Sequence, residues 1–434
     1  MATAAKRSKT DDETTASSSL PPEMLELILS KLDQKHLEPV ALVSKSFLST
    51  VRCLVYKLHI KNYIFNTPDL HSFDRFPYVE EITMSCQPSK HVLFAISDSK
   101  LNLKTLRLLK CRKSRALFTL STSKRIISTL RCLQINWHVS DEFISRFDSE
   151  QLIRLIQLFP SVTELELTLS GHWDNPLMLG IVSKLRNLQR LDLRGSKYLT
   201  GGTLAAIYSN CVYLEHLDVR HCYGVISGGI GALMRSCEHL HSLDLPELVI
   251  DDSPEASIEQ ACANPRLVEL METISSCENL KHLSFRRGFL ARDVILRTYA
   301  KSRPPLSTLT IHRDSKTTED TNFSMAGVSE LIHACRGRLV QLDVELPRSD
   351  KLDTQDREMS LLVAQLPHLE YIKIVGWASS MDETLESLKS NCPFLKLALL
   401  YWNAADGGKI KLKMLRQGEN SYSIKQKYRK SWWA

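Results

Sequence analysis

The chain has 434 residues, of which 43% are apolar and 24% are charged, and this composition excludes a fibrous or wholly disordered protein. No apolar run approaches the roughly 18 residues of a membrane span, and the N-terminus lacks the apolar core of a secretory signal. We therefore expect no membrane span and a place in the cytoplasm or nucleus. The eleven cysteines are then expected to be reduced thiols.

Residues 1–18 consist mainly of Ala, Thr, Ser and mixed charges, which cannot build a hydrophobic core. We expect a disordered N-terminal tail. Lys6, Arg7 and Lys9 also fit part of a nuclear import signal, but so short a basic motif often occurs by chance. A solvated tail is the simpler interpretation.

Residues 19–60 predict a compact unit of three short helices. Pro21 favours an extended Leu20, and Pro22 suits the first turn of a helix. One helical apolar stripe then runs through Leu25, Ile28, Leu29 and Leu32. Ser44 can cap a last helix whose apolar side carries Phe47, Leu48, Val51, Leu54 and Val55. A unit of about 40 residues usually needs a partner or a neighbouring domain to be stable.

This stretch resembles the F-box. The resemblance is carried by Leu20-Pro21, Glu23, Leu25, Ile28-Leu29, Leu32 and above all Leu42-Val43-Ser44-Lys45-Ser46-Phe47, while Pro39 departs from it inside a short second helix. It implies docking on a Skp-type adaptor and, through it, on a cullin–RING ubiquitin ligase. The residues expected to form that docking surface or the small core behind it are Leu20, Pro21, Leu25, Ile28, Leu29, Val43, Ser44 and Phe47. Alternatively, the unit only covers the open edge of the repeats that follow.

Residues 61–408 carry a leucine-rich repeat about twelve times. It is plainest at 185–245, where Leu-x-x-Leu-x-Leu or a close variant recurs every 26 residues and leads into an apolar helical run. Alternating leucines predict a strand with one buried face, and such units must stack. The leading apolar positions are Val79, Leu103, Leu130, Val162, Leu188, Leu214, Leu240, Leu280, Leu306, Leu339, Leu369 and Leu395. We predict an α/β solenoid, with a curved parallel sheet and outer helices.

Several cysteines follow the repeat. Cys211, Cys237, Cys277 and Cys392 each stand three residues before a leading leucine. Metal ligands converge on one point, whereas residues one repeat apart stack along the solenoid. We therefore interpret these cysteines as small buried residues with weakly hydrogen-bonded thiols. The Cys-x-x-Leu start also resembles the repeat subtype that is common in F-box proteins.

The remaining strand side chains should line the inside of the arc. The candidate target-binding residues there are Arg190, Asp192, Arg194, His216, Asp218, Arg220, His282 and Arg286. Arcs of stacked repeats commonly bind partners on this face, although a solvated surface of weak ion pairs is the alternative. We expect a protein target and no nucleic acid, because Lys409–Ala434 alone accounts for the net charge of +7.

Several repeats are longer than 26 residues and therefore contain insertions. Loops are expected along one rim at Gly171–Pro176, in the acidic stretch between Asp244 and Leu280, and at Arg313–Ala326, Pro347–Glu358 and Gly376–Asp382.

Residues 409–434 are expected to form a basic cap and tail. Lys409–Met414 alternates charged and apolar residues, which predicts a half-buried strand that covers the last repeat. Ile410, Leu412 and Met414 should point inward. Past Gly418 this pattern stops, and basic residues mixed with Tyr and Trp suit an anionic membrane or an acidic partner. The simpler alternative is that the aromatic residues fold back on the last helix.

No motif for nucleotide binding, hydrolysis or metal catalysis occurs, so we expect neither enzymatic activity nor a cofactor nor a metal. The resemblance implies the substrate-recognition subunit of a Skp–cullin–F-box ubiquitin ligase, which promotes proteasomal degradation by holding a target near the ligase. One alternative is an interaction scaffold that binds the adaptor without target turnover. Another is a small-molecule co-receptor, since hormone receptors are similar in general architecture.

Overall fold

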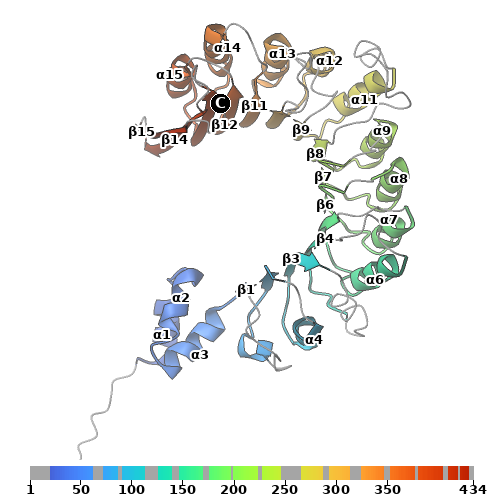
Figure 1. The fold of residues 1–434 in the computed structure, drawn as a ribbon, viewed down its shortest axis with the longest axis vertical. Coiled ribbons are helices and arrows are strands. Elements are labelled where there is room, and N and C mark those ends of the chain that lie inside the picture. Colours follow the sequence, from blue (N-terminus) through green and yellow to red (C-terminus); the bar gives the residue numbers. More distant parts are fainter. Residues whose placement is uncertain are drawn as a thin grey trace, which may run out of the picture.

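The computed structural model describes residues 20–61, 72–86, 90–112, 126–138, 146–169, 175–196, 199–222, 227–245, 265–286, 293–312, 324–346, 352–376, 380–403, 409–418 and 421–429. The chain forms one open arc, with strands along the inside and helices along the outside (Figure 1). Three further helices stand at its N-terminal end. The fold is therefore a leucine-rich-repeat solenoid preceded by a small helical unit, as predicted.

All described strands belong to one 15-stranded sheet in chain order. The parallel part comprises β1 (Lys57–Ile60), β2 (Glu81–Met84), β3 (Thr105–Arg112), β4 (Cys132–His138), β5 (Glu164–Leu169), β6 (Arg190–Asp192), β7 (His216–Asp218), β8 (Ser242–Leu245), β9 (His282–Arg286), β10 (Thr308–His312), β11 (Gln341–Glu345), β12 (Tyr371–Gly376) and β13 (Leu397–Asn403). Strands β2–β13 are the twelve predicted ones, and every leading apolar residue is at most 2% exposed. Strand β1 was not predicted. It lies within residues 19–60 but pairs in parallel with β2.

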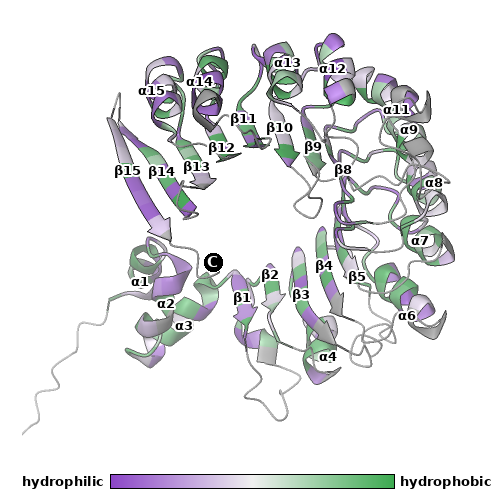
Figure 2. Cartoon of the chain, turned by 45° about the horizontal axis from the view of Figure 1, so that its top comes forward, coloured by the Kyte–Doolittle hydropathy of each residue, from purple (hydrophilic) through white to green (hydrophobic). Residues whose placement is uncertain are grey.

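The helices cover the outer side of the sheet and enclose one continuous hydrophobic core between the two layers (Figure 2). They are η1 (Ser72–Arg75), α4 (Lys90–Asp98), α6 (Arg146–Gln157), α7 (Asn175–Val182), α8 (Gly201–Asn210), α9 (Ser227–Ser236), α11 (Pro265–Ser275), α12 (Asp293–Lys301), α13 (Met325–Cys335), α14 (Leu352–Val363) and α15 (Asp382–Asn391). The predicted loop at Pro347–Glu358 is therefore wrong in part, because α14 begins at Leu352. The loop expected between Asp244 and Leu280 is likewise wrong in part, because α11 lies within it. The acidic residues that mark this stretch lie outside the described residues, and they are Glu247, Asp251, Asp252, Glu255 and Glu259.

Carboxylates on one helix cap the next helix and so lock neighbouring repeats together. Asp356 of α14 accepts hydrogen bonds from the backbone N–H of Thr384, at 2.9 Å, and of Glu383, at 3.0 Å, in the first turn of α15. Asp293 of α12 likewise accepts the backbone N–H of Ser324 at 2.7 Å, and Ser324 caps α13. These contacts satisfy backbone donors that a helix leaves free, and they place negative charge where the helix dipole favours it.

Of the cysteines that stand three residues before a leading leucine, Cys211, Cys237 and Cys392 are buried as predicted, whereas Cys277 is only partly buried. Cys222 is buried as well. Cys222 Sγ donates to the Leu193 carbonyl oxygen of the preceding repeat at 3.1 Å, and Cys392 Sγ donates to that of Val363 at 3.5 Å. Burial raises the pKa of both thiols to about 12. These residues are therefore buried packing elements, and no cluster that could hold a metal ion occurs within the described ranges.

The sheet ends differently at its two edges. Helix α2 (Gln34–Val40) covers the β1 edge, because the Gln34 amide donates to the Lys57 carbonyl oxygen and its oxygen accepts the Lys57 N–H at 3.3 Å. At the other end the chain turns back twice. Strand β14 (Lys409–Gly418) pairs antiparallel with β13, and β15 (Ser421–Arg429) pairs antiparallel with β14.

This C-terminal hairpin confirms one predicted strand and adds one that was not predicted. The strand expected at Lys409–Met414 is present, with Leu412 and Met414 buried and Ile410 packed against the core. The strand past Gly418 was not predicted: β15 continues the sheet for nine residues and includes Tyr422 and Tyr428, which were expected either to meet a partner or to fold back on the last helix. Its serines, lysines and Gln426 obscure the strand in the sequence, although Tyr422 packs against the core. Backbone pairing with β14 also holds it in the sheet.

Candidate functional site

The N-terminal unit has its own small core. Helices α1 (Pro22–Leu29), α2 and α3 (Lys45–Leu54) bury Leu25, Leu29, Leu37 and Val51 against one another. Leu25 and Leu29 lie four residues apart and thus on the same side of α1. Phe47 packs against this core while half-buried, and Ser44 caps α3 by accepting the Phe47 N–H at 3.2 Å. Of the predicted docking residues, Leu25 and Leu29 therefore belong to the core, and Phe47 packs against it. Ser44 is exposed and acts as the helix cap.

The other predicted docking residues lie at the surface. Leu20 and Ile28 are half exposed, Val43 is 67% exposed, and Pro21 is exposed as well. Sequence reasoning missed four more exposed apolar side chains of the same unit, which are Met24, Leu27, Leu32 and Leu42. Helix α1 is apolar on nearly all sides, and a helix of that kind in a soluble unit is covered on both faces. The apolar character of α1 on both sides could therefore have shown that one set of its residues forms the core and another set lies at the surface.

The inner surface of the arc, called here the concave face, carries a ladder of charges at its centre. Glu166, Asp192, Asp218 and Asp244 stand in register on β5, β6, β7 and β8. Neighbouring strands lie about 4.8 Å apart, so four carboxylates in a row would repel one another strongly. Cations must therefore lie between them.

Two arginines supply that compensation. Arg194 Nη2 lies 2.8 Å from Asp192 and 3.6 Å from Glu166, and its Nε is 3.3 Å from Asp218. Arg220 Nε donates to Asp218 at 2.9 Å and lies 3.6 Å from Asp244. Beyond them, His282 Nε2 is 3.4 Å from Asp244. The arginines interleave with the carboxylates, and both lie in turns that directly follow β6 and β7.

The ladder shifts the pKa values of its members in different directions. Burial, aided by neighbouring carboxylates, raises the pKa of Glu166 and of Asp218 above the usual range. Burial acts on Asp244 too, but the hydrogen bond and charge of His282, together with Arg220, lower its pKa overall. Burial first, and then the charge of Arg190, lowers the pKa of His216.

The eight predicted target-binding residues therefore divide into two groups. Asp192, Arg194, Asp218 and Arg220 neutralise one another, and with His282 they form the inner wall of the arc. Arg190 is exposed and makes no ion pair with any carboxylate in the described ranges, and His216 stands beside it on β7. Arg286 ends β9, and its backbone is in register with His312 of β10. Arg190 and His216 are thus the residues of this set best placed to meet a partner.

A second charged group lies further along the concave face. Asp343 of β11 accepts two hydrogen bonds from Lys373 Nζ, at 3.0 and 3.1 Å, and lies 2.9 Å from His312 Nε2. Burial would raise the pKa of Asp343, but the hydrogen bonds and charges of His312 and Lys373 lower it. These three residues are not among the predicted target-binding residues, and their pairing is hard to see in the sequence because they lie 30 or more positions apart.

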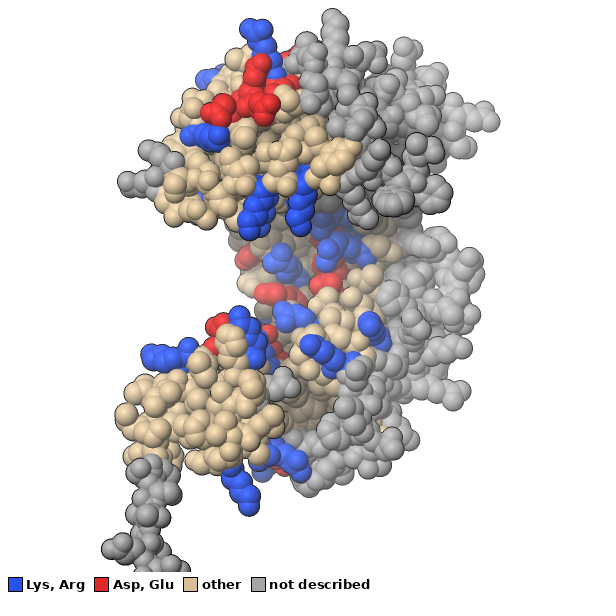
Figure 3. Space-filling view, turned by 60° about the vertical axis from the view of Figure 1, so that its left-hand side comes forward, with Lys and Arg blue, Asp and Glu red and all other residues tan. Residues whose placement is uncertain are grey.

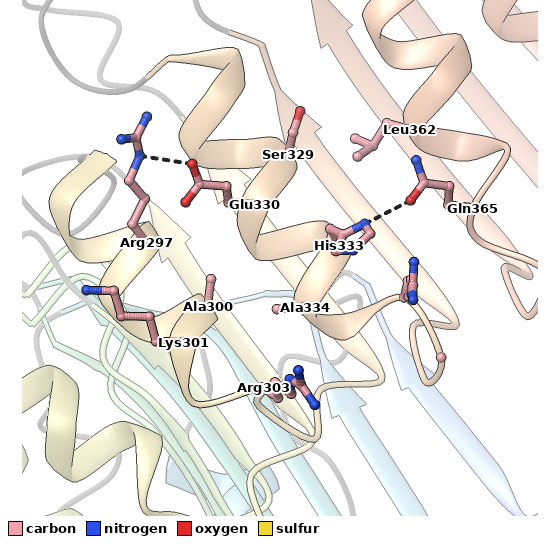
Figure 4. A pocket seen from close by; sticks show the side chains of 12 residues that line it. Arg297, Ala300, Lys301, Arg303, Ser329, Glu330, His333, Ala334, Leu362 and Gln365 are labelled. Carbon is pink, nitrogen blue, oxygen red and sulfur yellow. Dashed lines mark hydrogen bonds and ion pairs between the residues drawn. The ribbon is translucent and has the colours of Figure 1, made fainter.

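The outer side of the arc holds a basic pocket of about 830 Å³ between α12, α13 and α14 (Figure 4). Arg297, Lys301, Arg303 and Arg336 line it, and Glu330 supplies a negative charge. Arg297 Nε lies 3.4 Å from Glu330, which leaves Lys301, Arg303 and Arg336 without a carboxylate partner among the described residues. Such a pocket can receive an anionic group. The sequence did not reveal it, because its cations come from helix ends and turns in successive repeats.

No described helix is both long and apolar enough to cross a bilayer.

Comparison with known proteins gives one family match, in the N-terminal unit, and similarities to solved structures. The family described as the F-box domain matches residues 17–58. Among solved structures, the leucine-rich repeat-containing protein LegL7 from Legionella pneumophila has a TM-score of 0.42 at 16% identity, over 69% of this chain and 90% of that one. The TLR13–ssRNA13 complex has a TM-score of 0.43 at 12% identity, over 83% of this chain, which spans 58% of that protein. No curated protein sequence matches this chain.

Proposed function

We propose that this F-box and leucine-rich-repeat protein is the substrate-recognition subunit of a Skp–cullin–F-box ubiquitin ligase, with its F-box on the adaptor and its arc on a target. The observation that carries the proposal is the division of apolar residues in the F-box. Four of them form its core, while Leu20, Met24, Leu27, Ile28, Leu32, Leu42 and Val43 remain exposed.

So much exposed apolar surface on so small a unit indicates a protein partner, because soluble proteins rarely leave contiguous apolar patches uncovered. Burying one Leu, Ile or Val side chain in an interface contributes about 1.5–3 kcal/mol. Leu42, at 86% exposure, and Val43 occupy the turn between α2 and α3, where they protrude. The same turn contains the part of the sequence that most resembles the F-box.

The arc supplies the second binding surface in this proposal. Its concave face is polar and has its central charges already paired, so it is suited to hydrogen bonds with a folded or extended protein segment. The chain carries out no chemistry of its own in this function. It raises the effective concentration of target lysines near a ubiquitin carrier that the ligase holds.

The test of adaptor binding uses two exposed residues. Ile28→Ala combined with Val43→Ala should weaken co-purification of a Skp-type adaptor tenfold or more, since each side chain buries apolar area only in the complex. Leu179→Ala combined with Leu361→Ala removes equally exposed apolar side chains from α7 and α14 and serves as the matched control. Equal adaptor binding by both double variants would refute the assignment of the docking surface.

The target-binding half is tested at Arg190 and His216. Arg190→Glu with His216→Ala should reduce capture of the target and leave adaptor binding unchanged, because neither residue supports the charge ladder. Charge reversal at Arg194 or Arg220 is a poor test, since it would place a fifth negative charge among four carboxylates. A target that the Arg190 and His216 variant still captures and ubiquitylates at the normal rate is recognised elsewhere.

A further inference from the structure

The last two strands form a basic ribbon with an unusual pairing of like charges. Lys413 of β14 stands directly opposite Lys425 of β15, and Lys411 stands directly opposite Lys427. Side chains paired in this way lie about 5 Å apart on the same face, and like charges there are destabilising. Neither strand contains an acidic residue. No ion pair joins the four lysines to any carboxylate in the described part of the chain.

The four lysines face the inside of the arc. Lys411 and Lys413 are in register with Tyr401 and Leu399 of β13, and Lys411 Nζ lies 4.9 Å from the centre of the Tyr401 ring. In Figure 3 the C-terminal end of the arc is at the top, and Lys and Arg side chains project from it into the hollow. The ribbon thus adds a positive area, with no carboxylate partner among the described residues, to a concave face whose central charges are paired.

The outer edge of β15 has no neighbouring strand among the described residues. Strand β15 pairs with β14 alone among the described strands, whereas the β1 edge is covered by Gln34 of the F-box. On the side away from the lysines, Ile424 is 42% exposed and Tyr428 is 50% exposed. An edge strand with free backbone groups and partly exposed apolar residues is a template for one more strand.

Protection against unwanted pairing explains only part of this arrangement. Lysines on an edge strand commonly prevent aggregation, and Lys425 and Lys427 fit that role. Lys411 and Lys413 do not, because β14 is paired on both sides and edge protection gains nothing there. Their effect is to double the positive charge on one face of the ribbon, at a cost in hairpin stability.

We infer that the ribbon binds an extended segment of a partner protein in which acidic and apolar residues alternate. The segment adds as a strand to the β15 edge. Its carboxylates lie on the face of Lys411, Lys413, Lys425 and Lys427, and its apolar side chains cover Ile424 and Tyr428 on the other face. A flat anionic bilayer fits less well, because these lysines line the hollow of the arc.

This inference deepens the proposed function and rests on it only in taking the partner to be a ubiquitylation target. Binding of the segment needs neither adaptor nor ligase. An assay with the full chain and a synthetic peptide therefore tests the ribbon independently of the F-box, and a failure of either proposal leaves the other measurable.

The experiment measures binding of a fluorescent peptide in which Glu alternates with Val and Thr. Lys425→Glu with Lys427→Glu should weaken binding at least about tenfold, since two charged contacts become repulsive. The same variant should melt at an equal or higher temperature, because each new Glu faces a lysine across the ribbon. Loss of binding without loss of stability is the result that a merely structural role would not produce.

Three controls make the outcome decisive. Lys184→Glu with Lys281→Glu changes the net charge equally at exposed sites outside the ribbon and should bind like the parent. Lys301→Gln with Arg336→Gln removes two cations from the outer pocket and should also bind normally. The peptide with alternate backbone nitrogens methylated should not bind, because it cannot pair with a strand edge.

The inference is overturned if the ribbon variant binds the peptide as the parent does, or if either control variant loses as much affinity. Binding of the methylated peptide would exclude strand addition. Attachment of the parent protein to phosphatidylserine vesicles with no binding of the peptide would assign the ribbon to a membrane surface instead.

Discussion

Replacing Arg220 by Gln should destabilise the centre of the arc, and the loss should depend on pH. Arg220 is 18% exposed and lies between Asp218 and Asp244 on adjacent strands. Gln has a similar shape without the charge, so the variant leaves the packing of the turn largely intact. What it removes is the positive charge that allows two carboxylates to stand in register.

The expected magnitude follows from these contacts. Arg220 Nε donates to both carboxylate oxygens of Asp218, at 2.9 and 3.1 Å, and a hydrogen bond to a charged group contributes about 1.5–3 kcal/mol. Without it, Asp218 and Asp244 would repel by about 3 kcal/mol at a separation of about 5 Å and an effective dielectric constant of about 20. Protonation of Asp218 can relieve part of this. We expect a loss of about 2–4 kcal/mol at neutral pH.

The sign of the pH dependence is fixed by the pKa of Asp218. Burial already raises that pKa, against the lowering effect of Arg220, so removing Arg220 raises it further. A carboxyl group with a raised folded-state pKa binds more protons in the folded than in the unfolded protein. Its contribution to stability therefore falls as the pH rises through that pKa. The deficit of the variant should be largest near neutral pH and should shrink on mild acidification.

Urea unfolding at neutral and mildly acidic pH measures both the loss and its pH dependence. Arg235→Gln is the matched control, because Arg235 lies 3.7 Å from Glu269 on exposed helix surfaces, where an ion pair contributes at most about 1 kcal/mol. Equal free energies of unfolding for the two variants at both pH values would refute the reasoning that the ladder depends on interleaved arginines.

Three further predictions concern other parts of the fold. Iodoacetamide should alkylate the exposed Cys53 well before Cys222, because burial raises the pKa of the Cys222 thiol to about 12. Peptide mass spectrometry over time measures both alkylation rates, and equal rates would contradict this. Asp356→Ala should cost about 2–3 kcal/mol in urea unfolding, because it leaves the first turn of α15 uncapped, whereas the exposed Asp382→Ala should cost less. Ending the chain at Gly418 removes β15 and exposes the edge of β14, so light scattering should rise, and an unchanged monomer would show that β15 is dispensable.

The repeats were predictable from the sequence because the stacking of repeats determines both the sequence period and which residues are buried. Each leading apolar residue faces the layer of helices, and the stacking of neighbours requires the same residue type at the same place. The positions of Leu188, Leu214 and Leu240 therefore identify three successive strands and the side of each strand that faces the hydrophobic core. The three helices of the F-box were predictable for a similar reason, from an apolar stripe and the cap at Ser44.

What the sequence did not reveal depends on neighbours that are distant in the chain. The period places Arg194 and Arg220 on the inner face, but it does not say whether they point at a partner or at each other's carboxylates. That outcome is decided by the register of β5 to β8, which brings together residues 26 apart. Strand β15 was missed because its many polar residues hide a weak alternation, and much of what holds it in the sheet is backbone pairing with β14.

The junction between the F-box and the arc bears directly on how such a protein would work. Val55 packs against both hydrophobic cores, and Gln34 of α2 contacts the backbone of Lys57 in β1. Lys57 in turn pairs with Glu81 of β2 at 3.0 Å. The F-box is thus fixed to the first strands and not tethered by a flexible linker. Holding a target near a ligase is most effective when the distance between the adaptor-binding unit and the target-binding arc is fixed. A flexible linker would lower the effective concentration of the bound target. A rigid junction therefore favours the proposed subunit that presents its target in one orientation. The helical unit covers the sheet edge and, in this proposal, also carries the docking surface.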